Sequence, residues 1–195
     1  NSLKFKVGAY VIIALTLTVF VFALVLVQNN RDELLKQVII NSAQLSRVVM
    51  GSTRFAMHQN KPYEVDQIIN DVAAQPEIEK VRILSKNGIV KHSSKIDEIG
   101  MQIDQEAEAC LACHLDEKSR SESPLIGRSR FFSSPDGRRM LGATAVIHNE
   151  PTCAGAGCHE SIELQPVLGV LDIIYPLDEI EHTLRANTYT VFGLS

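Results

Sequence analysis

The chain of 195 residues is 45% hydrophobic, which is enough to form one domain with its own core. Its net charge of −4 excludes the strongly basic surface that nucleic-acid-binding proteins use. The sequence shows no pairing of a nucleophile with a base and no glycine-rich phosphate loop, so it predicts no catalytic site.

A long apolar stretch near the N-terminus predicts a membrane anchor over residues 7–27. Val7 to Val27 contain no charged side chain, and about 20 such residues form a helix that crosses a hydrocarbon layer of roughly 30 Å. A cleaved signal peptide is the alternative, but its apolar region is only about 7–15 residues long. Lys4 and Lys6 precede the stretch, so the positive-inside rule places residues 1–6 in the cytoplasm and the main domain in the periplasm.

The next segment, residues 28–60, is expected to form a long periplasmic helix. Its apolar and small polar residues recur three or four positions apart, at Leu34, Val38, Asn41, Leu45, Val48, Ser52 and Phe55. This stripe favours pairing with the same helix of a second copy, and therefore a homodimer. Packing on the chain's own domain is the alternative, because the stripe is short and contains Asn41 and Ser52.

Residues 61–185 are expected to form an α+β domain. Pro62 ends the long helix, and a shorter amphipathic helix runs to about Pro76. Apolar, β-prone segments then predict five strands, which are Val81–Leu84, Ile89–His92, Arg128–Phe132, Met140–Ile147 and Val167–Tyr175. Asn87-Gly88 marks a hairpin, because both residues tolerate positive φ, and Pro135-Asp136-Gly137 marks another. The economical arrangement is a PAS-like antiparallel sheet of about five strands with helices on one side.

All four cysteines fall into two motifs that end in histidine, Cys110–His114 and Cys153–His159. This is how c-type haem is attached, because the thiols bond to the vinyl groups and the adjacent imidazole binds the iron. Disulfides or a tetrahedral zinc site would suit the cysteine spacings, but neither requires the histidines. We therefore predict two covalently bound haem c groups in the connections of the sheet. The attachment residues are Cys110, Cys113, Cys153 and Cys158, and the proximal iron ligands are His114 and His159.

The ligand on the opposite face of each iron decides the chemistry. A second histidine or a methionine favours electron transfer, while an open position favours binding of a diatomic gas. The candidates for this distal position are Met57, His58, His92 and His148. Four arginines of the second hairpin are candidates for binding the haem propionates, or else form an ordinary solvated edge: Arg128, Arg130, Arg138 and Arg139.

Short segments with characteristic order and spacing occur between Val81 and Ile174. They are Val81-Arg82-Ile83, Asn87-Gly88, Ser93-Ser94, Glu98-Ile99-Gly100, Ala107 through His114, Pro135-Asp136-Gly137, Asn149-Glu150-Pro151, Cys153 through His159 and Val167 through Asp172. Together they resemble the dihaem c-type sensor domains of bacterial transmembrane receptors, especially histidine kinases. The resemblance implies a PAS-like domain between two membrane spans, followed by a cytoplasmic kinase or chemotaxis module. Met57 resembles a methionine near the end of the leading helix in such proteins.

The C-terminal residues 186–195 carry no charge and are expected to begin a second transmembrane helix, with an amphipathic terminal helix as the alternative. Covalent haem attachment takes place outside the bacterial cytoplasmic membrane, which agrees with the predicted topology. The leading hypothesis is a membrane-anchored periplasmic dihaem sensor of redox state or of a diatomic gas. The alternative is a membrane-anchored dihaem electron-transfer subunit of a respiratory or photosynthetic complex.

Overall fold

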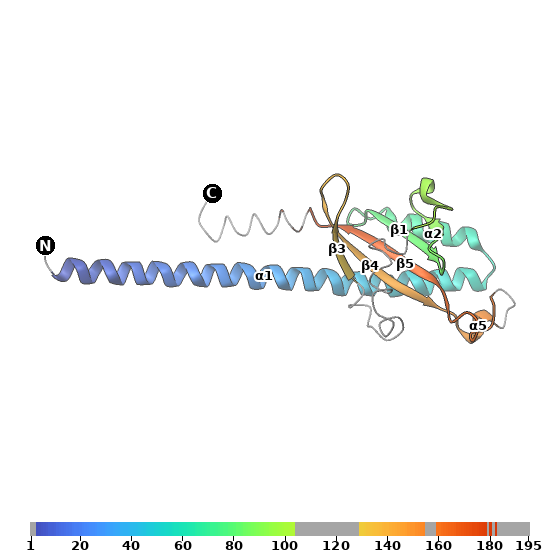
Figure 1. Cartoon of the computed structure of the whole chain (residues 1–195), viewed down its shortest axis with the longest axis horizontal. Helices are drawn as coiled ribbons and strands as arrows, with labels where there is room; N and C mark the ends of the chain where they lie inside the picture. Colours follow the sequence, from blue (N-terminus) through green and yellow to red (C-terminus); the bar gives the residue numbers. More distant parts are fainter. Residues whose placement is uncertain (1–2, 104–128, 155–158, 179, 181, 183–195) are drawn as a thin grey trace. The chain divides into compact units, whose positions relative to one another are not determined.

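The computed structural model describes residues 3–103, 129–154, 159–178, 180 and 182 (Figure 1). It divides into two units, of which Ile39–Leu177 contains the whole sheet, and Asn1–Val38 with Asp178–Ser195 forms the other. The fold is α+β, with a long N-terminal helix and a five-stranded antiparallel sheet. This part of the sequence-based prediction is confirmed.

The long helix α1 spans Leu3–His58. It ends in a Schellman motif, in which Asn60 adopts a left-handed φ of 53°. The Lys61 N–H donates to the carbonyl of Ala56 at 3.1 Å, and the Asn60 N–H donates to the carbonyl of Met57 at 2.9 Å. The stop signal is therefore Asn60, while Pro62 begins the next helix, α2 Pro62–Ala73, where its missing N–H costs nothing.

By length and composition, one described helix is able to cross a membrane, and it is α1 from Phe5 onwards. Its apolar side chains in this part are open to the surroundings; Leu15 and Phe22, for example, are each 62% exposed. A signal sequence near an N-terminus has the same composition, so the anchor and its orientation stay predictions.

Within the unit Ile39–Leu177, α1 buries a face of small side chains. The buried residues of this face are Ser42, Ala43, Ser46, Val49, Thr53 and Ala56. Hydroxyl groups on it donate back to helix carbonyls, Ser46 to Ser42 and Thr53 to Val49, both at 2.9 Å. Because these polar groups are satisfied within the helix, they can be buried at little cost.

The predicted stripe on this helix does not form the buried face. Val48 and Phe55, two members of the stripe, are 64% and 65% exposed. The predicted stripe contains large apolar residues, whereas the residues that α1 buries are mostly small. The stripe is thus open at these two positions, and its pairing with a second copy stays a prediction.

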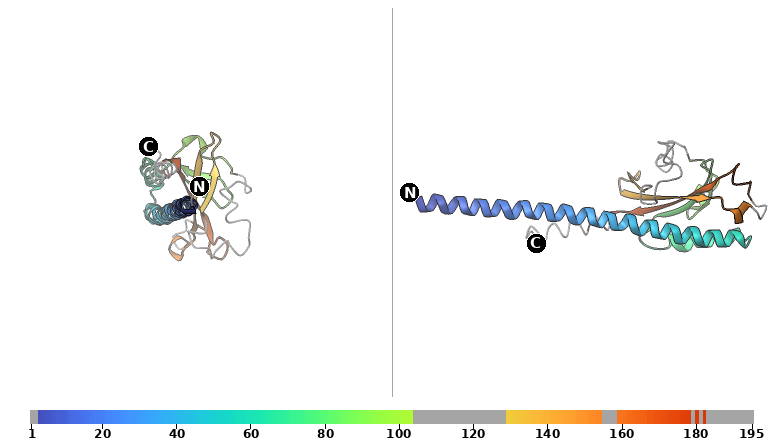
Figure 2. Two further views of the ribbon diagram at one scale, coloured as in Figure 1. Left: turned by 90° about the vertical axis from the view of Figure 1, so that its left-hand side faces the viewer. Right: turned by 90° about the horizontal axis from the view of Figure 1, so that it is seen from below.

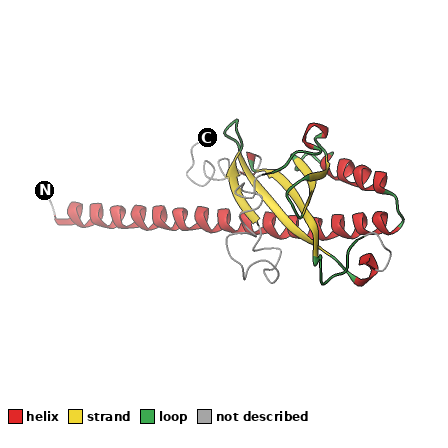
Figure 3. Cartoon of the chain, turned by 45° about the vertical axis from the view of Figure 1, so that its right-hand side comes forward, coloured by secondary structure: helices red, strands yellow, loops and turns green. Residues whose placement is uncertain are grey.

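The sheet has the strand order β2-β1-β5-β4-β3, with every neighbouring pair antiparallel. The strands are β1 Lys80–Ser85, β2 Val90–Ser93, β3 Ser129–Ser133, β4 Arg139–His148 and β5 Val167–Pro176. Each observed strand overlaps the segment that the sequence predicted. The described parts of the connections contain two short helical elements, η1 Ile96–Glu98 and α5 Pro151–Ala154. Figure 2 shows α2 and the C-terminal turns of α1 on the same side of the sheet, and Figure 3 colours the strands yellow and the helices red.

The turn between β1 and β2 differs in detail from the predicted one. Only Gly88 adopts positive φ, at 76°, and Asn87 does not. The Gly88 N–H donates to the Ser85 carbonyl at 2.9 Å, and the Ser85 N–H donates to the Ile89 carbonyl at 2.8 Å. This is a three-residue loop closed by a glycine bulge rather than a two-residue turn.

The centre of the sheet contains a buried carboxylate between two arginines. Asp172 on β5 is fully buried, and its oxygens lie 3.0 Å from Nη2 of Arg82 and 2.8 Å from Nη1 of Arg130. Thr144 donates its hydroxyl to the same carboxylate at 3.3 Å. Gly142 makes room for this arrangement, because a Cβ there would lie 2.4 Å from Cζ of Arg130. Burial alone would raise the pKa of Asp172, but the charges of Arg130 and Arg82 outweigh it and hold the pKa below its ordinary value.

Replacing this carboxylate, in Asp172→Asn, is expected to lower the free energy of unfolding by about 3–5 kcal/mol at neutral pH, because two buried arginines lose their counter-charge. Since the folded pKa of Asp172 is depressed, this contribution is present above the ordinary pKa of 3.8 and is lost as the pH falls through the folded value. Urea unfolding followed by circular dichroism at neutral and acidic pH measures both effects.

The matched control is Asp97→Asn, which removes an exposed carboxylate in η1 and is expected to change the unfolding free energy by less than about 0.5 kcal/mol. An Asp172→Asn protein as stable as the wild type at neutral pH would contradict the role assigned to the buried pair.

Candidate functional site

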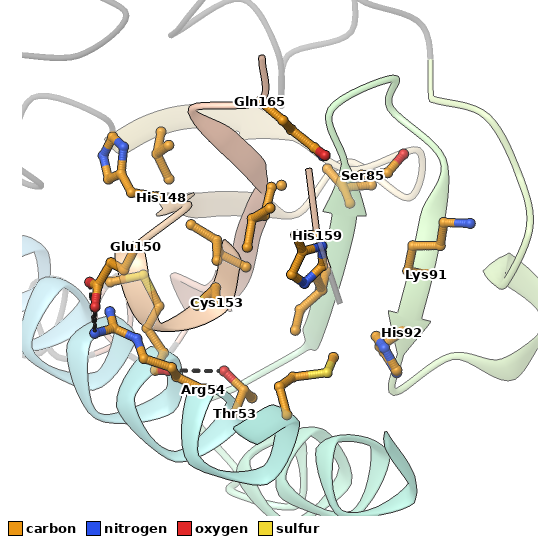
Figure 4. Close-up of a pocket in the computed structure, with 18 residues that line it drawn as sticks. Thr53, Arg54, Ser85, Lys91, His92, His148, Glu150, Cys153, His159 and Gln165 are labelled. Atoms are coloured by element: carbon orange, nitrogen blue, oxygen red, sulfur yellow. Dashed lines mark hydrogen bonds and ion pairs between the residues drawn. The ribbon is translucent and has the colours of Figure 1, made fainter. Parts of the chain in front are cut away.

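A cavity of about 470 Å³ lies between the C-terminal turns of α1 and one end of the sheet, within the unit Ile39–Leu177 (Figure 4). Its volume is in the range of ordinary ligand and cofactor pockets, about 300–1,000 Å³. Ile83, Val146 and Leu168 give it an apolar lining. The sulfur- and imidazole-bearing residues that line it are Met50, Met57, His92, His148, Cys153 and His159.

One wall of the cavity comes from the connection between β4 and β5. Pro151 begins the short helix α5, and the Cys153 N–H donates to the Glu150 carbonyl at 2.8 Å. The Cys153 thiol is free within the described part of the chain. His159 follows on the same connection and also lines the cavity. Two members of the second cysteine–histidine motif thus border one space.

Asn149 holds this connection in place. Its side-chain amide is buried and donates to the carbonyls of Glu160 and Gln165, both at 2.9 Å. Its backbone N–H donates to the Pro166 carbonyl at 2.9 Å. These three hydrogen bonds close the loop immediately after His159. Asn149 therefore anchors the segment that follows the proximal histidine candidate.

The helix α1 forms the opposite wall through Met50, Thr53, Arg54 and Met57. Arg54 Nη1 lies 2.7 Å from Oε1 of Glu150, and this ion pair joins the helix to the connection that contains Cys153 (Figure 4). Both side chains are close to half exposed, so the pair contributes only about 0–1 kcal/mol. It is one contact between the two walls.

A third wall comes from β2, through Lys91 and His92. The Nδ1 atom of His92 lies 2.6 Å from Oδ1 of Asp66 on α2. The His92 side chain is 16% exposed, whereas Asp66 is half exposed. In the view of Figure 4, His159 lies between Cys153 and His92, and His148 lies on the opposite side of Cys153 from His159. The chain thus places imidazole groups from three separate elements around one cavity.

The structure brings together some of the predicted site residues and not others. Met57, His92 and His148 share the cavity with Cys153 and His159, whereas His58 is not among its lining residues. Four predicted haem residues, namely Cys110, Cys113, His114 and Cys158, lie outside the described residues. Within the described ranges, no group of three His, Cys, Asp or Glu side chains is arranged to hold a bare metal ion.

Two of the arginines considered for the haem propionates are engaged elsewhere. Arg130 is bonded to Asp172, and Arg138 lies 2.6 Å from Asp136 and 3.2 Å from Glu79. Hydrogen bonds from the Ser134 hydroxyl and from Arg138 lower the pKa of Asp136 to about 2. The cations that line the cavity are instead Arg54 and Lys91, which the sequence interpretation missed.

Asn149 and Asp66 were also missed as site residues. Asn149 belongs to a segment noted only for its resemblance, and Asp66 is an exposed position of an amphipathic helix with no local motif around it. Their roles depend on contacts with residues 11 to 26 positions away. A one-sequence pattern gives no signal for such contacts.

Comparison of the chain with protein-family models finds no matching family, and comparison with curated proteins finds no match.

Shortening the side chain in Asn149→Ala is expected to destabilise the connection by about 1–3 kcal/mol, because two buried carbonyl groups lose their donor. Hydrogen–deuterium exchange measures this locally, and the amides of Leu164 and Gln165, which donate to Ser161, should exchange faster. Asn70→Ala on the exposed face of α2 is the matched control and should leave these amides unchanged. Unaltered protection in Asn149→Ala would show that the loop is held by other contacts.

Proposed function

We propose that the chain is a membrane-anchored periplasmic domain that binds two c-type haems and senses redox state or a diatomic gas. The observation that carries the proposal is the shared cavity. It joins Cys153 and His159 of one motif with Met57 and His92 from elements far away in the sequence. This combination suits a c-type haem, because a thiol and the adjacent histidine attach it and a methionine or second histidine is available for the opposite face of the ring.

The residues around the cavity fit a haem in their chemistry. Cys153 supplies a free thiol for a thioether bond, and His159 supplies the imidazole next to the motif. Apolar side chains such as Ile83 and Leu168 suit the porphyrin ring, and Arg54 and Lys91 are positive charges for its carboxylates. When bound, the haem would supply an iron that exchanges electrons or takes a gas ligand.

The chain's own residues would bind and orient this group. Asn149 anchors the connection after His159, and the Arg54–Glu150 pair links the same connection to α1. The second haem of the proposal rests on the Cys110–His114 motif, whose spacing is the usual one for c-type haem.

The position of α1 favours a sensor. Four of its residues line the cavity, and the same helix begins in the apolar stretch that is long enough to cross a membrane. A change of ligation at the cavity therefore acts on a helix that continues into the predicted anchor. The exposed Val48 and Phe55 on this helix support pairing with a second copy of the chain, as the sequence predicted.

An electron carrier is the second candidate. It is supported by the exposure of His159, which would place the edge of its haem near the surface, where a redox partner can approach. An electron carrier needs two six-coordinate haems that do not bind carbon monoxide, whereas a gas sensor binds carbon monoxide at one of its haems. Absorption spectra of the reduced protein with and without carbon monoxide therefore distinguish a gas sensor from a redox sensor or an electron carrier.

The sensor proposal predicts that the two copies of α1 move when the haem changes state. A spin label at position 48, introduced as Val48→Cys, lies on the exposed side of α1 outside the cavity. The distance between the labels of two protomers is expected to differ between the oxidised protein and the reduced, carbon monoxide-treated protein in pulsed electron resonance.

The control carries the same label together with Cys153→Ala and Cys158→Ala, which removes the attachment of the haem at Cys153–His159. Its label distance should no longer respond to haem state if that haem drives the motion. Equal distances in both states of the labelled chain with intact cysteines would exclude signalling through this helix.

A further inference from the structure

We propose that Asp66 is a positioning residue that holds His92 as the second iron ligand of the haem attached at Cys153–His159. In this arrangement Nε2 of His92 binds the iron on the face opposite His159. The inference rests on the proposed function, because it requires a haem in the cavity. It goes further by choosing among the distal candidates and by assigning a role to α2.

The sheet register sets the direction of His92. His92 on β2 pairs with Ile83 on β1, and both residues line the cavity. Paired residues of antiparallel strands project to the same face of the sheet. The contact of His92 with Asp66 places this face on the side of α2, and Figure 2 shows α1 and α2 on one side of the sheet. Only 16% of the His92 side chain is exposed, so most of it lies between the strand, α2 and the cavity.

The hydrogen bond to Asp66 fixes which nitrogen of His92 remains available. An ionised carboxylate only accepts hydrogen bonds, so Nδ1 of His92 donates to Oδ1 of Asp66 across 2.6 Å. The lone pair of the neutral ring then lies on Nε2, which is the atom that binds metals in carboxylate–histidine–metal arrangements. Asp66 thus selects the tautomer and stops rotation of the ring.

The other distal candidates are not oriented for iron binding in this way. His148 is the last residue of β4 and is exposed, and His58 does not line the cavity. Met57 lines the cavity, but 43% of the residue is exposed. Among the described imidazoles around the cavity, only that of His92 donates to a carboxylate.

This pairing connects the iron to α2. Asp66 lies on the second turn of that helix, which is joined to α1 by the tight turn at Asn60. A carboxylate behind the histidine makes the ring a stronger electron donor, which favours the oxidised, more positive iron. Reduction of a bound haem would therefore weaken its bond to His92.

The test uses the full chain with both haems attached, in detergent, and compares Asp66→Asn with Asp71→Asn. Asp71 is an exposed carboxylate on the same helix, so the two variants change the net charge equally. Cyanide, which competes with a protein ligand for oxidised iron, is titrated while the Soret band is followed. The two midpoint potentials are measured on the same samples.

In Asp66→Asn, cyanide is expected to bind one of the two haems about 10–100-fold more tightly than in the wild type, because loss of the supporting carboxylate weakens the histidine ligand by that factor. The potential of the same haem should rise, by about 59 mV for each tenfold weakening of the oxidised form relative to the reduced form. Asp71→Asn should leave both quantities unchanged.

A double variant shows whether Asp66 acts through His92. In the His92→Ala background, which already lacks the ligand, adding Asp66→Asn should change neither cyanide affinity nor potential further. The inference would be overturned if Asp66→Asn had equal effects with and without His92. It would also be overturned if Asp66→Asn left the cyanide affinity and both potentials at their wild-type values. In both cases the proposed function would stand. Absence of any haem at Cys153–His159 would instead overturn the proposed function, and this inference with it.

Discussion

The burial of one face of α1 within the unit Ile39–Leu177 is the constraint on which the candidate site depends. It is possible because the helix buries small side chains, from Ser42 to Ala56, whose hydroxyl groups are satisfied within the helix itself. At the adjoining helix positions, the long and flexible side chains of Met50 and Met57 line the cavity instead.

The cavity is completed by connections that are tied back to the same layers. Asn149 and the Arg54–Glu150 pair fix the connection that contains Cys153 and His159, and the Asp66–His92 pair fixes the edge strand. The haem proposal thus depends on contacts that close one space from several sides. The cavity is shared between the sheet and α1, which leads to the predicted anchor.

The strands were predictable because each is a short apolar run bounded by turn residues, as in Val167–Tyr175. The strand order was not predictable, since β5 lies at the centre through contacts with residues about 90 positions away, such as that between Asp172 and Arg82. The haem attachment residues and the distal candidates were predicted from motif and position. In the structure, Met57, His92 and His148 line one cavity together with Cys153 and His159. The buried face of α1 was missed, because serine and threonine carry little hydrophobic signal.

The most direct test of the account is the intact mass of the full chain purified from a bacterium that performs c-type haem attachment. The account predicts the mass of the polypeptide plus two haems, and plus one haem when Cys153 and Cys158 are both replaced by alanine. A mass equal to that of the polypeptide alone, or lowered by the hydrogens lost in disulfide formation, would contradict the account.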